Sequence, residues 1–130
     1  MLEDSKAFSG FSVDDLEAAK RFYGKTLGLE VKDGPMGTMD LVVGGGTSIL
    51  VYPKENHEPA TFTILNFPVS NIDAAVDELT KAGIRMERYD NMMGDAKADK
   101  KGIYRGEGPA IAWFKDPAGN VLSVMEQAGH

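Results

Sequence analysis

The stretch that decides the fold is VDDLEAAKRFY at residues 13–23, because a similar stretch, VSNIDAAVDEL, returns at residues 69–79. The two copies are offset by 56 positions, from Val13 to Val69, and Lys25 and Lys81 keep the same offset. A repeat of this length indicates one supersecondary unit that is used twice.

Each copy predicts an amphipathic helix that begins and ends by the same devices. Asp14 and Ser70 occupy equivalent positions, where a side-chain oxygen can accept the free N–H groups of a helix start. Gly28 and Gly83 follow the two helices, where glycine closes a helix with a positive φ at no steric cost. The apolar residues that share one face of each helix are Leu16, Ala19, Phe22, Tyr23 and Leu27 in the first copy and Ile72, Ala75, Val76 and Leu79 in the second.

Composition and charge restrict the class of protein. A chain of 130 residues makes one domain of ordinary size. A net charge of −6 and a pI near 4.8 argue against nucleic acid or an anionic membrane surface as the partner, because both require a basic face. The absence of cysteine removes thiolate nucleophiles and sulfur ligands for metals. The polar start and the lack of a long apolar run predict neither a secretion signal nor a membrane span, so we expect a cytoplasmic protein.

The rest of each copy predicts strands, in the order strand, helix, strand, strand, strand. Residues 90–108 make a long, glycine-rich, charged connection, and such loops are commonly functional. A lid that carries Met92 and Met93 over a pocket and a solvated hairpin extension are equally good interpretations of this segment. The predicted strands are 7–13, 29–32, 38–43, 47–52, 61–69, 84–89, 111–115 and 121–126, with a proline- and glycine-containing turn, DPAGN, at residues 116–120.

Three motifs together resemble the glyoxalase/bleomycin-resistance/extradiol-dioxygenase superfamily, also called vicinal oxygen chelate proteins. They are the VDDLEAAKRFYGKTLGL run at residues 13–29, its weaker echo at residues 69–84, and DPAGN near the end. The resemblance implies an α+β fold in which two βαβββ modules form curved sheets around a cleft, with the helices outside. It implies one domain over residues 1–130, with module 1 at about 6–53, a linker at about 54–60 and module 2 at about 61–127.

The resemblance also locates the positions where many relatives bind a divalent metal. The first-strand ligand, usually a His, falls on Phe8 and Ile64 in the two modules. The last-strand ligand, usually a Glu, falls on Ser123, and superposing the two modules carries that position onto Leu50. Three hydrocarbon side chains and one neutral hydroxyl are not ligands for zinc, iron or manganese. We therefore expect no metal site and no cofactor.

The remaining site candidates describe an apolar pocket with a few polar groups, a composition typical of small-molecule sites. His57, in the linker, and Tyr52 are the weak catalytic candidates, although a solvated loop histidine is the simpler interpretation of His57. The other histidine, His130, is terminal. Tyr104 and Arg105, in the long connection, could close over an anionic or aromatic ligand, although a solvated side chain is the simpler interpretation of Arg105. The ligand-binding candidates are Phe8, Leu50, Tyr52, Ile64, Asn66, Trp113, Ser123, Met125, Tyr104 and Arg105.

Three hypotheses for function follow from the sequence. The favoured one is a metal-independent protein that sequesters or carries an apolar or aromatic small molecule, as the resistance proteins of the resembled superfamily do. The second is an enzyme, either a glyoxalase-like lyase or a dioxygenase-type enzyme. The third is a homodimeric structural or regulatory module without a ligand. The resemblance implies a homodimer in any of these cases.

Overall fold

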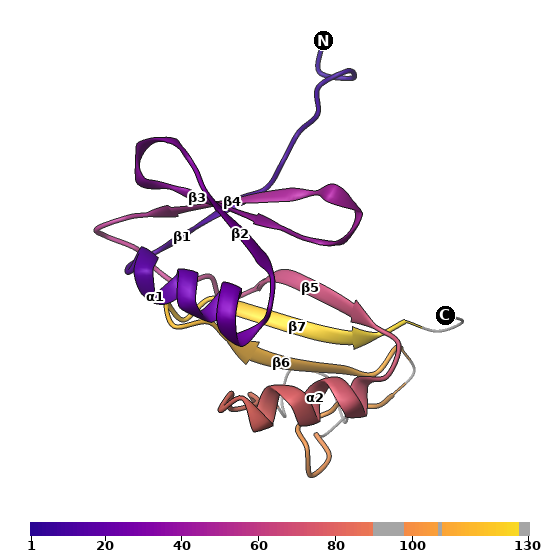
Figure 1. The fold of residues 1–130 in the computed structure, drawn as a ribbon. Coiled ribbons are helices and arrows are strands. Elements are labelled where there is room, and N and C mark those ends of the chain that lie inside the picture. The colour runs from indigo at the N-terminus through magenta and orange to yellow at the C-terminus, as the bar shows by residue number, and fades with distance from the viewer. Residues whose placement is uncertain (90–97, 107, 128–130) are drawn as a thin grey trace. The chain divides into compact units, whose positions relative to one another are not determined.

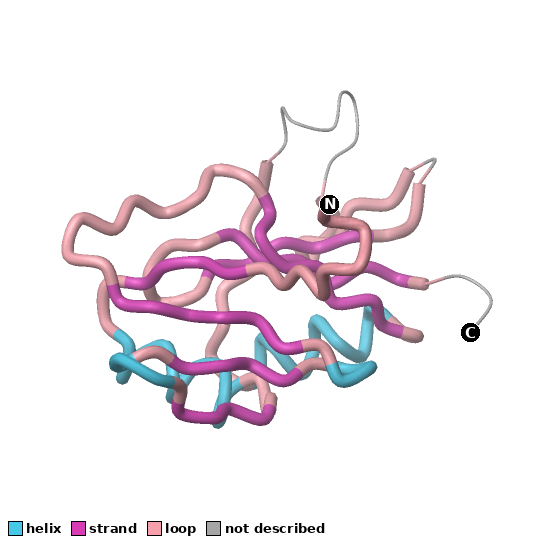
Figure 2. Tube along the Cα trace, turned by 90° about the horizontal axis from the view of Figure 1, so that it is seen from above, coloured by secondary structure: helices cyan, strands magenta, loops and turns pink. Residues whose placement is uncertain are grey.

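The computed structural model describes residues 1–89, 98–106 and 108–127, which fall into two units, Met1–Pro59 and Ala60–His130 (Figure 1). Figure 2 draws the remaining residues as grey traces. Met92, Met93 and His130 lie outside the described residues. Within the described part of the chain, neither helix is long and apolar enough to cross a membrane.

Unit 1 contains a four-stranded sheet in the order β1-β4-β3-β2. The first strand is parallel to the last, and the other neighbours are antiparallel. The helix continues into a π-helical turn at Phe22–Thr26. The elements are β1 (Gly10–Val13), α1 (Leu16–Arg21), β2 (Glu30–Asp33), β3 (Met39–Val42) and β4 (Ser48–Pro53).

The two faces of this sheet differ because successive side chains along a strand point to opposite sides. Phe11 and Val13 of β1 are buried, and the ring of Phe11 contacts the ring of Tyr23 at a centroid distance of 5.8 Å, so this face packs against the helical segment. The alternate residues of β1 and β4 lie on the opposite side of the sheet. We call that side the helix-free face of unit 1; it carries Gly10, Ser12, Leu50 and Tyr52.

Unit 2 also begins with a strand and a helix, but its described residues form one strand fewer after the helix. Its three strands have the order β5-β7-β6, and β5 is again parallel to the last strand. Figure 1 shows α2 alongside β6 and β7. The elements are β5 (Thr63–Val69), α2 (Ile72–Lys81), β6 (Ile111–Lys115) and β7 (Val121–Glu126).

The largest differences from the predicted strands are at residues 7–13 and 84–89. The first strand begins at Gly10 rather than Ala7, so Phe8 precedes it. Residues 84–89 form no strand; only Glu87 pairs with β6, in an isolated bridge to Trp113. The physical reason lies at Tyr89, whose backbone N–H donates to the Tyr104 hydroxyl instead of to a strand neighbour.

The helix starts also differ from the prediction by one residue. Asp15 and Asn71, not Asp14 and Ser70, are the N-caps. Each has an extended backbone, and each accepts the N–H three residues further on through its side-chain oxygen, at 3.1 and 3.0 Å. Asp15 and Asn71 are the caps because their backbones are extended and the helix begins at the residue that follows each of them.

The predicted DPAGN turn fixes the start of β7. Asp116 is buried, and its Oδ1 accepts the N–H groups of Ala118 and Asn120 at 2.9 and 2.8 Å. Its Oδ2 accepts from the Asn120 side-chain amide at 3.1 Å. Asn120 in turn accepts from the N–H of Ala60 at 3.4 Å, which ties the turn to the segment that leads into β5. Ser123, three residues after Asn120, is thereby held in register.

The cap assignment can be tested with two adjacent aspartates. Asp15→Ala should lower the free energy of unfolding by about 1 kcal/mol, because the N–H of Ala18 loses its acceptor. Asp14→Ala is the matched control and should change it by no more than about 0.5 kcal/mol. Urea denaturation followed by circular dichroism measures both. A larger loss in the Asp14 variant would contradict the assignment.

Candidate ligand-binding site

The helix-free face of unit 2 is identified by a contact between β7 and α2. Glu126 accepts the N–H of Ile72, at the start of α2, through Oε2 at 3.0 Å. Leu122 and Val124 alternate with Glu126 along the strand and are buried on this helix side. Ser123 therefore points to the opposite side of the sheet.

Four of the residues predicted from the sequence meet on this helix-free face of unit 2, which carries Asn66, Trp113, Val121, Ser123 and Met125. Asn66, Ser123 and Trp113 form one row across the three strands. The Ser123 hydroxyl donates to Asn66 Oδ1 at 2.6 Å, and the indole Nε1 of Trp113 donates to the hydroxyl of Thr63 at 3.0 Å. Met125 follows on the same face and is partly buried. Ile64 lies at an irregularity in the register between Thr63 and Leu65 and has no partner position on β7.

An aromatic cluster continues this face beyond Trp113. The rings of Tyr89 and Tyr104 meet the indole edge-on, with centroid distances of 5.6 and 5.3 Å. Tyr104 is 1% exposed, so it is packed into the cluster. Among the described residues the Tyr89 hydroxyl is buried without a hydrogen-bond partner, and its burial raises the pKa of Tyr89. Sequence reasoning did not single out Tyr89 or Thr63, although an aromatic residue at the end of a predicted strand was a usable signal.

Arg105 lies beside Tyr104 but is engaged with α2 and its own hairpin. Its guanidinium donates to both carboxylate oxygens of Asp73, at 3.0 and 2.9 Å, and to Asp99 at 3.3 Å. The hydrogen bond from Arg105 lowers the pKa of Asp73, and the Asp73 carboxylate in turn raises the pKa of Arg105. Lys101 makes a parallel contact with Asp77 of α2 at 3.1 Å. These ion pairs fasten the described part of the predicted lid to α2, and a ligand-binding role for Arg105 stays a prediction.

The helix-free face of unit 1 carries a second group of candidates. Ser12 lies opposite Tyr52 in the pairing of β1 with β4, and its hydroxyl is 2.7 Å from His57 Nδ1. A histidine in this position can take the hydroxyl proton or serve as a polar anchor for a ligand. Leu50 is on the same face and partly buried, whereas Phe8 precedes β1 and is 71% exposed.

The positions at which the resembled superfamily places metal ligands do not fit a divalent metal. In unit 1 they carry Phe8 and Leu50, and in unit 2 they carry Ile64 and Ser123. Hydrocarbon side chains offer no lone pair, and a neutral hydroxyl is a poor ligand by itself. Across the described ranges, no three His, Asp or Glu side chains gather closely enough to hold a metal ion.

Comparison with known families gives a match along nearly the whole chain. A model described as Glyoxalase/Bleomycin resistance protein/Dioxygenase superfamily matches residues 8–124. No curated protein matches the sequence. The family match agrees with the three motifs in the sequence.

Solved structures of similar fold cover most of the chain. TnmS3, an antibiotic binding protein from Streptomyces sp. CB03234, has a TM-score of 0.70 and 22% identity, covering 96% of this chain and 98% of TnmS3. A putative glyoxalase family protein from Bacillus anthracis has a TM-score of 0.65 and 24% identity, with 98% and 99% covered. A glyoxalase/bleomycin resistance protein from Streptomyces sp. CB03234 has a TM-score of 0.63 and 24% identity, with 92% and 99% covered. These similarities confirm the predicted α+β fold class.

The ion pair between Arg105 and Asp73 predicts a change that can be measured. In Arg105→Gln the pKa of Asp73 should rise toward the ordinary value, because the donor that lowers it is lost. The native pair stabilises the fold above the pKa of unfolded Asp, and this contribution disappears as the pH falls through the lowered pKa. Carboxyl-detected NMR titration measures the shift. Lys115→Gln is the control, since Lys115 lies near Glu87 instead; an unchanged Asp73 in Arg105→Gln would show that the pair does not form in solution.

Proposed function

We propose that this chain, which belongs to the glyoxalase/bleomycin resistance protein/dioxygenase superfamily, binds a small apolar or aromatic molecule without a divalent metal. The helix-free face of unit 2 supplies the binding groups on which the proposal rests. TnmS3, which shares the fold, is an antibiotic binding protein and provides a precedent for such a role.

The observation that carries the proposal is the hydrogen bond from Ser123 to Asn66. Ser123 stands at a position of the family's metal ligands, and it is buried with its hydroxyl engaged by an amide. Asn66 itself is exposed, but its hydrogen bond with the buried Ser123 hydroxyl holds the amide in one orientation. With Oδ1 turned toward Ser123, the Nδ2 group on the other side of the Asn66 amide becomes a donor for an oxygen of the ligand.

The aromatic cluster supports an aromatic ligand rather than a purely aliphatic one. Trp113, Tyr89 and Tyr104 already pack edge to face, and aromatic rings prefer this geometry. The buried Tyr89 hydroxyl adds a hydrogen-bonding group beside the rings. An apolar wall with two or three fixed polar groups selects a ligand by shape and by a few oriented hydrogen bonds.

The contact between Ser12 and His57 favours a second candidate, an enzyme in which His57 acts as a general base. The distance of 2.7 Å suits proton transfer between the serine oxygen and the imidazole. Without catalysis, the same pair would be a polar anchor on the helix-free face of unit 1, where Tyr52 lies opposite Ser12. The enzyme would change the mass of the bound molecule, whereas the binding protein would not.

We also propose that the protein is a homodimer. The family resemblance supports this, as does Phe62, a large apolar side chain that is 69% exposed just before β5. Size-exclusion chromatography with light scattering should give twice the chain mass of 14.0 kDa. Phe62→Asp should shift the mass toward the monomer, whereas Leu2→Asp, at another exposed position, should not. A wild-type mass of one chain would reject the dimer.

Ligand binding can be followed through Trp113, because it is the single tryptophan of the chain. Titration with neutral aromatic probes such as 2-naphthol and menadione should change its fluorescence saturably, with or without EDTA. Asn66→Ala should weaken binding of the responding probe by about tenfold, the effect of one lost hydrogen bond. Asn56→Ala, an exposed asparagine of the linker, is the matched control and should bind like the wild type.

Three results would contradict the proposal. They are the absence of any saturable response, a response that EDTA abolishes, and equal weakening in the two asparagine variants. Conversion of a probe, detected by mass spectrometry and lost in His57→Ala, would favour the enzyme instead.

A further inference from the structure

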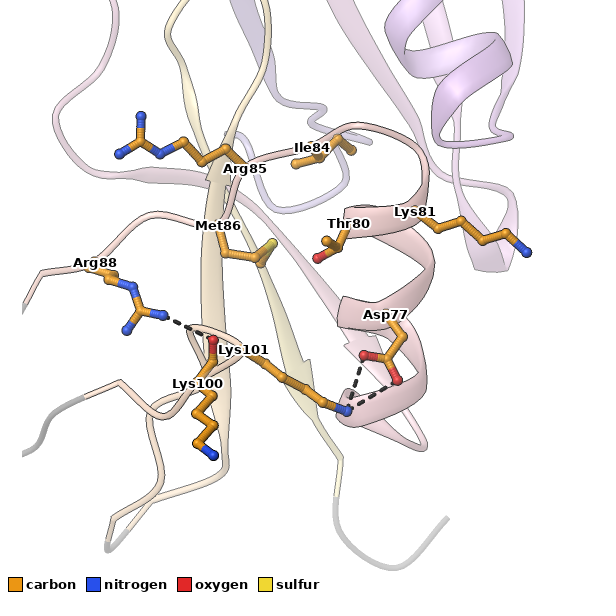
Figure 3. A pocket seen from close by; sticks show the side chains of 9 residues that line it. All are labelled: Asp77, Thr80, Lys81, Ile84, Arg85, Met86, Arg88, Lys100 and Lys101. Atoms are coloured by element: carbon orange, nitrogen blue, oxygen red, sulfur yellow. Dashed lines mark hydrogen bonds and ion pairs between the residues drawn. The ribbon is translucent and has the colours of Figure 1, made fainter.

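Unit 2 contains a pocket on the α2 side, away from the row of Asn66, Ser123 and Trp113. Its volume is about 590 Å³, a size that holds a small organic molecule. The second half of α2, residues 84–88 and the hairpin at residues 98–104 surround it (Figure 3). The lining residues are Asp77, Thr80, Lys81, Ile84, Arg85, Met86, Arg88, Lys100 and Lys101.

The charge of this pocket is opposite to that of the protein. Five of the lining side chains are cationic and one is a carboxylate, whereas the whole chain carries −6. A concentration of positive charge in a hollow of an acidic protein focuses the field on that hollow and attracts anions.

The cationic side chains of the pocket make different contacts in the structure. The Arg88 guanidinium donates to the backbone carbonyls of Asp99 and Lys100, at 3.0 and 3.1 Å, and is held in place with N–H groups to spare. Lys101 crosses the pocket to Asp77, as Figure 3 shows. In the described part of the chain, Arg85 and the ammonium of Lys100 make no ion pair.

The floor of the pocket is largely apolar, and the hairpin packs closely on it. Thr80 and Met86 face one another across it, with Ile84 above them (Figure 3). Gly102 has a φ of +89°, and a Cβ at this position would lie 2.9 Å from the Cβ of Met86. The hairpin therefore packs directly on Met86, because only glycine has both the required backbone conformation and the required space.

We propose that this pocket binds a small organic anion, with a phosphate group on the cations and an apolar body over Ile84 and Met86. Guanidinium and ammonium groups together are the usual ligands of phosphate in proteins. Arg85 and Lys81 point outward in Figure 3. Exposed side chains of this type change rotamer within nanoseconds, so they can turn to a bound anion.

Phenyl phosphate is the probe that tests this site, because it combines a phosphate group with an apolar ring. Heteronuclear NMR titration of the full chain should give saturable shifts of the backbone amides at residues 80–88 and 100–101. Inorganic phosphate should shift the same amides with about tenfold weaker affinity, since it lacks the apolar contact. Phenol, which lacks the charge, should leave them unshifted.

The matched variants separate a local site from the overall field of the protein. Arg85→Gln/Lys100→Gln should weaken phenyl phosphate binding by at least about tenfold, through the loss of charge-assisted hydrogen bonds. Arg21→Gln/Lys25→Gln also removes two positive charges, but from exposed positions of unit 1. It should leave the affinity for phenyl phosphate within about twofold of the wild type. Equal weakening in both variants, shifts located elsewhere, or no saturable shift would overturn the proposal. None of these results depends on ligand binding at the helix-free faces.

Discussion

The parallel pairing of the first and last strands in each unit determines where the candidate site residues lie. A parallel pair cannot be closed by a tight turn, so the chain must cross over through the helix before the last strand is laid beside the first. In unit 2 this constraint places Ser123 of β7 directly beside Asn66 of β5, and in unit 1 it places Tyr52 of β4 beside Ser12 of β1. The buried Asp116 in the DPAGN turn then sets the register of β7. The helix-free faces are the result of this topology.

The sequence predicted the parts of the fold that depend on local patterns. The 56-residue repeat located both helices, the strands before them and the strand after the first helix. Gly28 and Gly83 have the positive φ values, +77° and +93°, that the pattern required. The caps were misplaced by one residue because Asp14 and Asp15, like Ser70 and Asn71, offer two adjacent side-chain acceptors. Only the backbone angles distinguish them.

Interactions between distant residues could not be predicted in the same way. Residues 84–89 have the alternation of a strand, but the hydroxyl of Tyr104 takes the N–H of Tyr89 and only Glu87 pairs with β6. The contacts of Arg105 and Lys101 with α2 join residues more than twenty positions apart, so no local sequence pattern could predict them. For the candidate site, the sequence named Asn66, Ser123 and Trp113 individually. Their hydrogen bonds and the cationic pocket beside α2 could be identified only from the structure.

We propose that the residues at the positions where the superfamily binds a metal serve an organic ligand instead. The most direct test is native mass spectrometry of protein expressed in medium supplemented with zinc, iron and manganese. We expect chains without a stoichiometric divalent ion, which keep any organic adduct after treatment with EDTA. One tightly held divalent ion per chain, removed by EDTA together with the adduct, would contradict it.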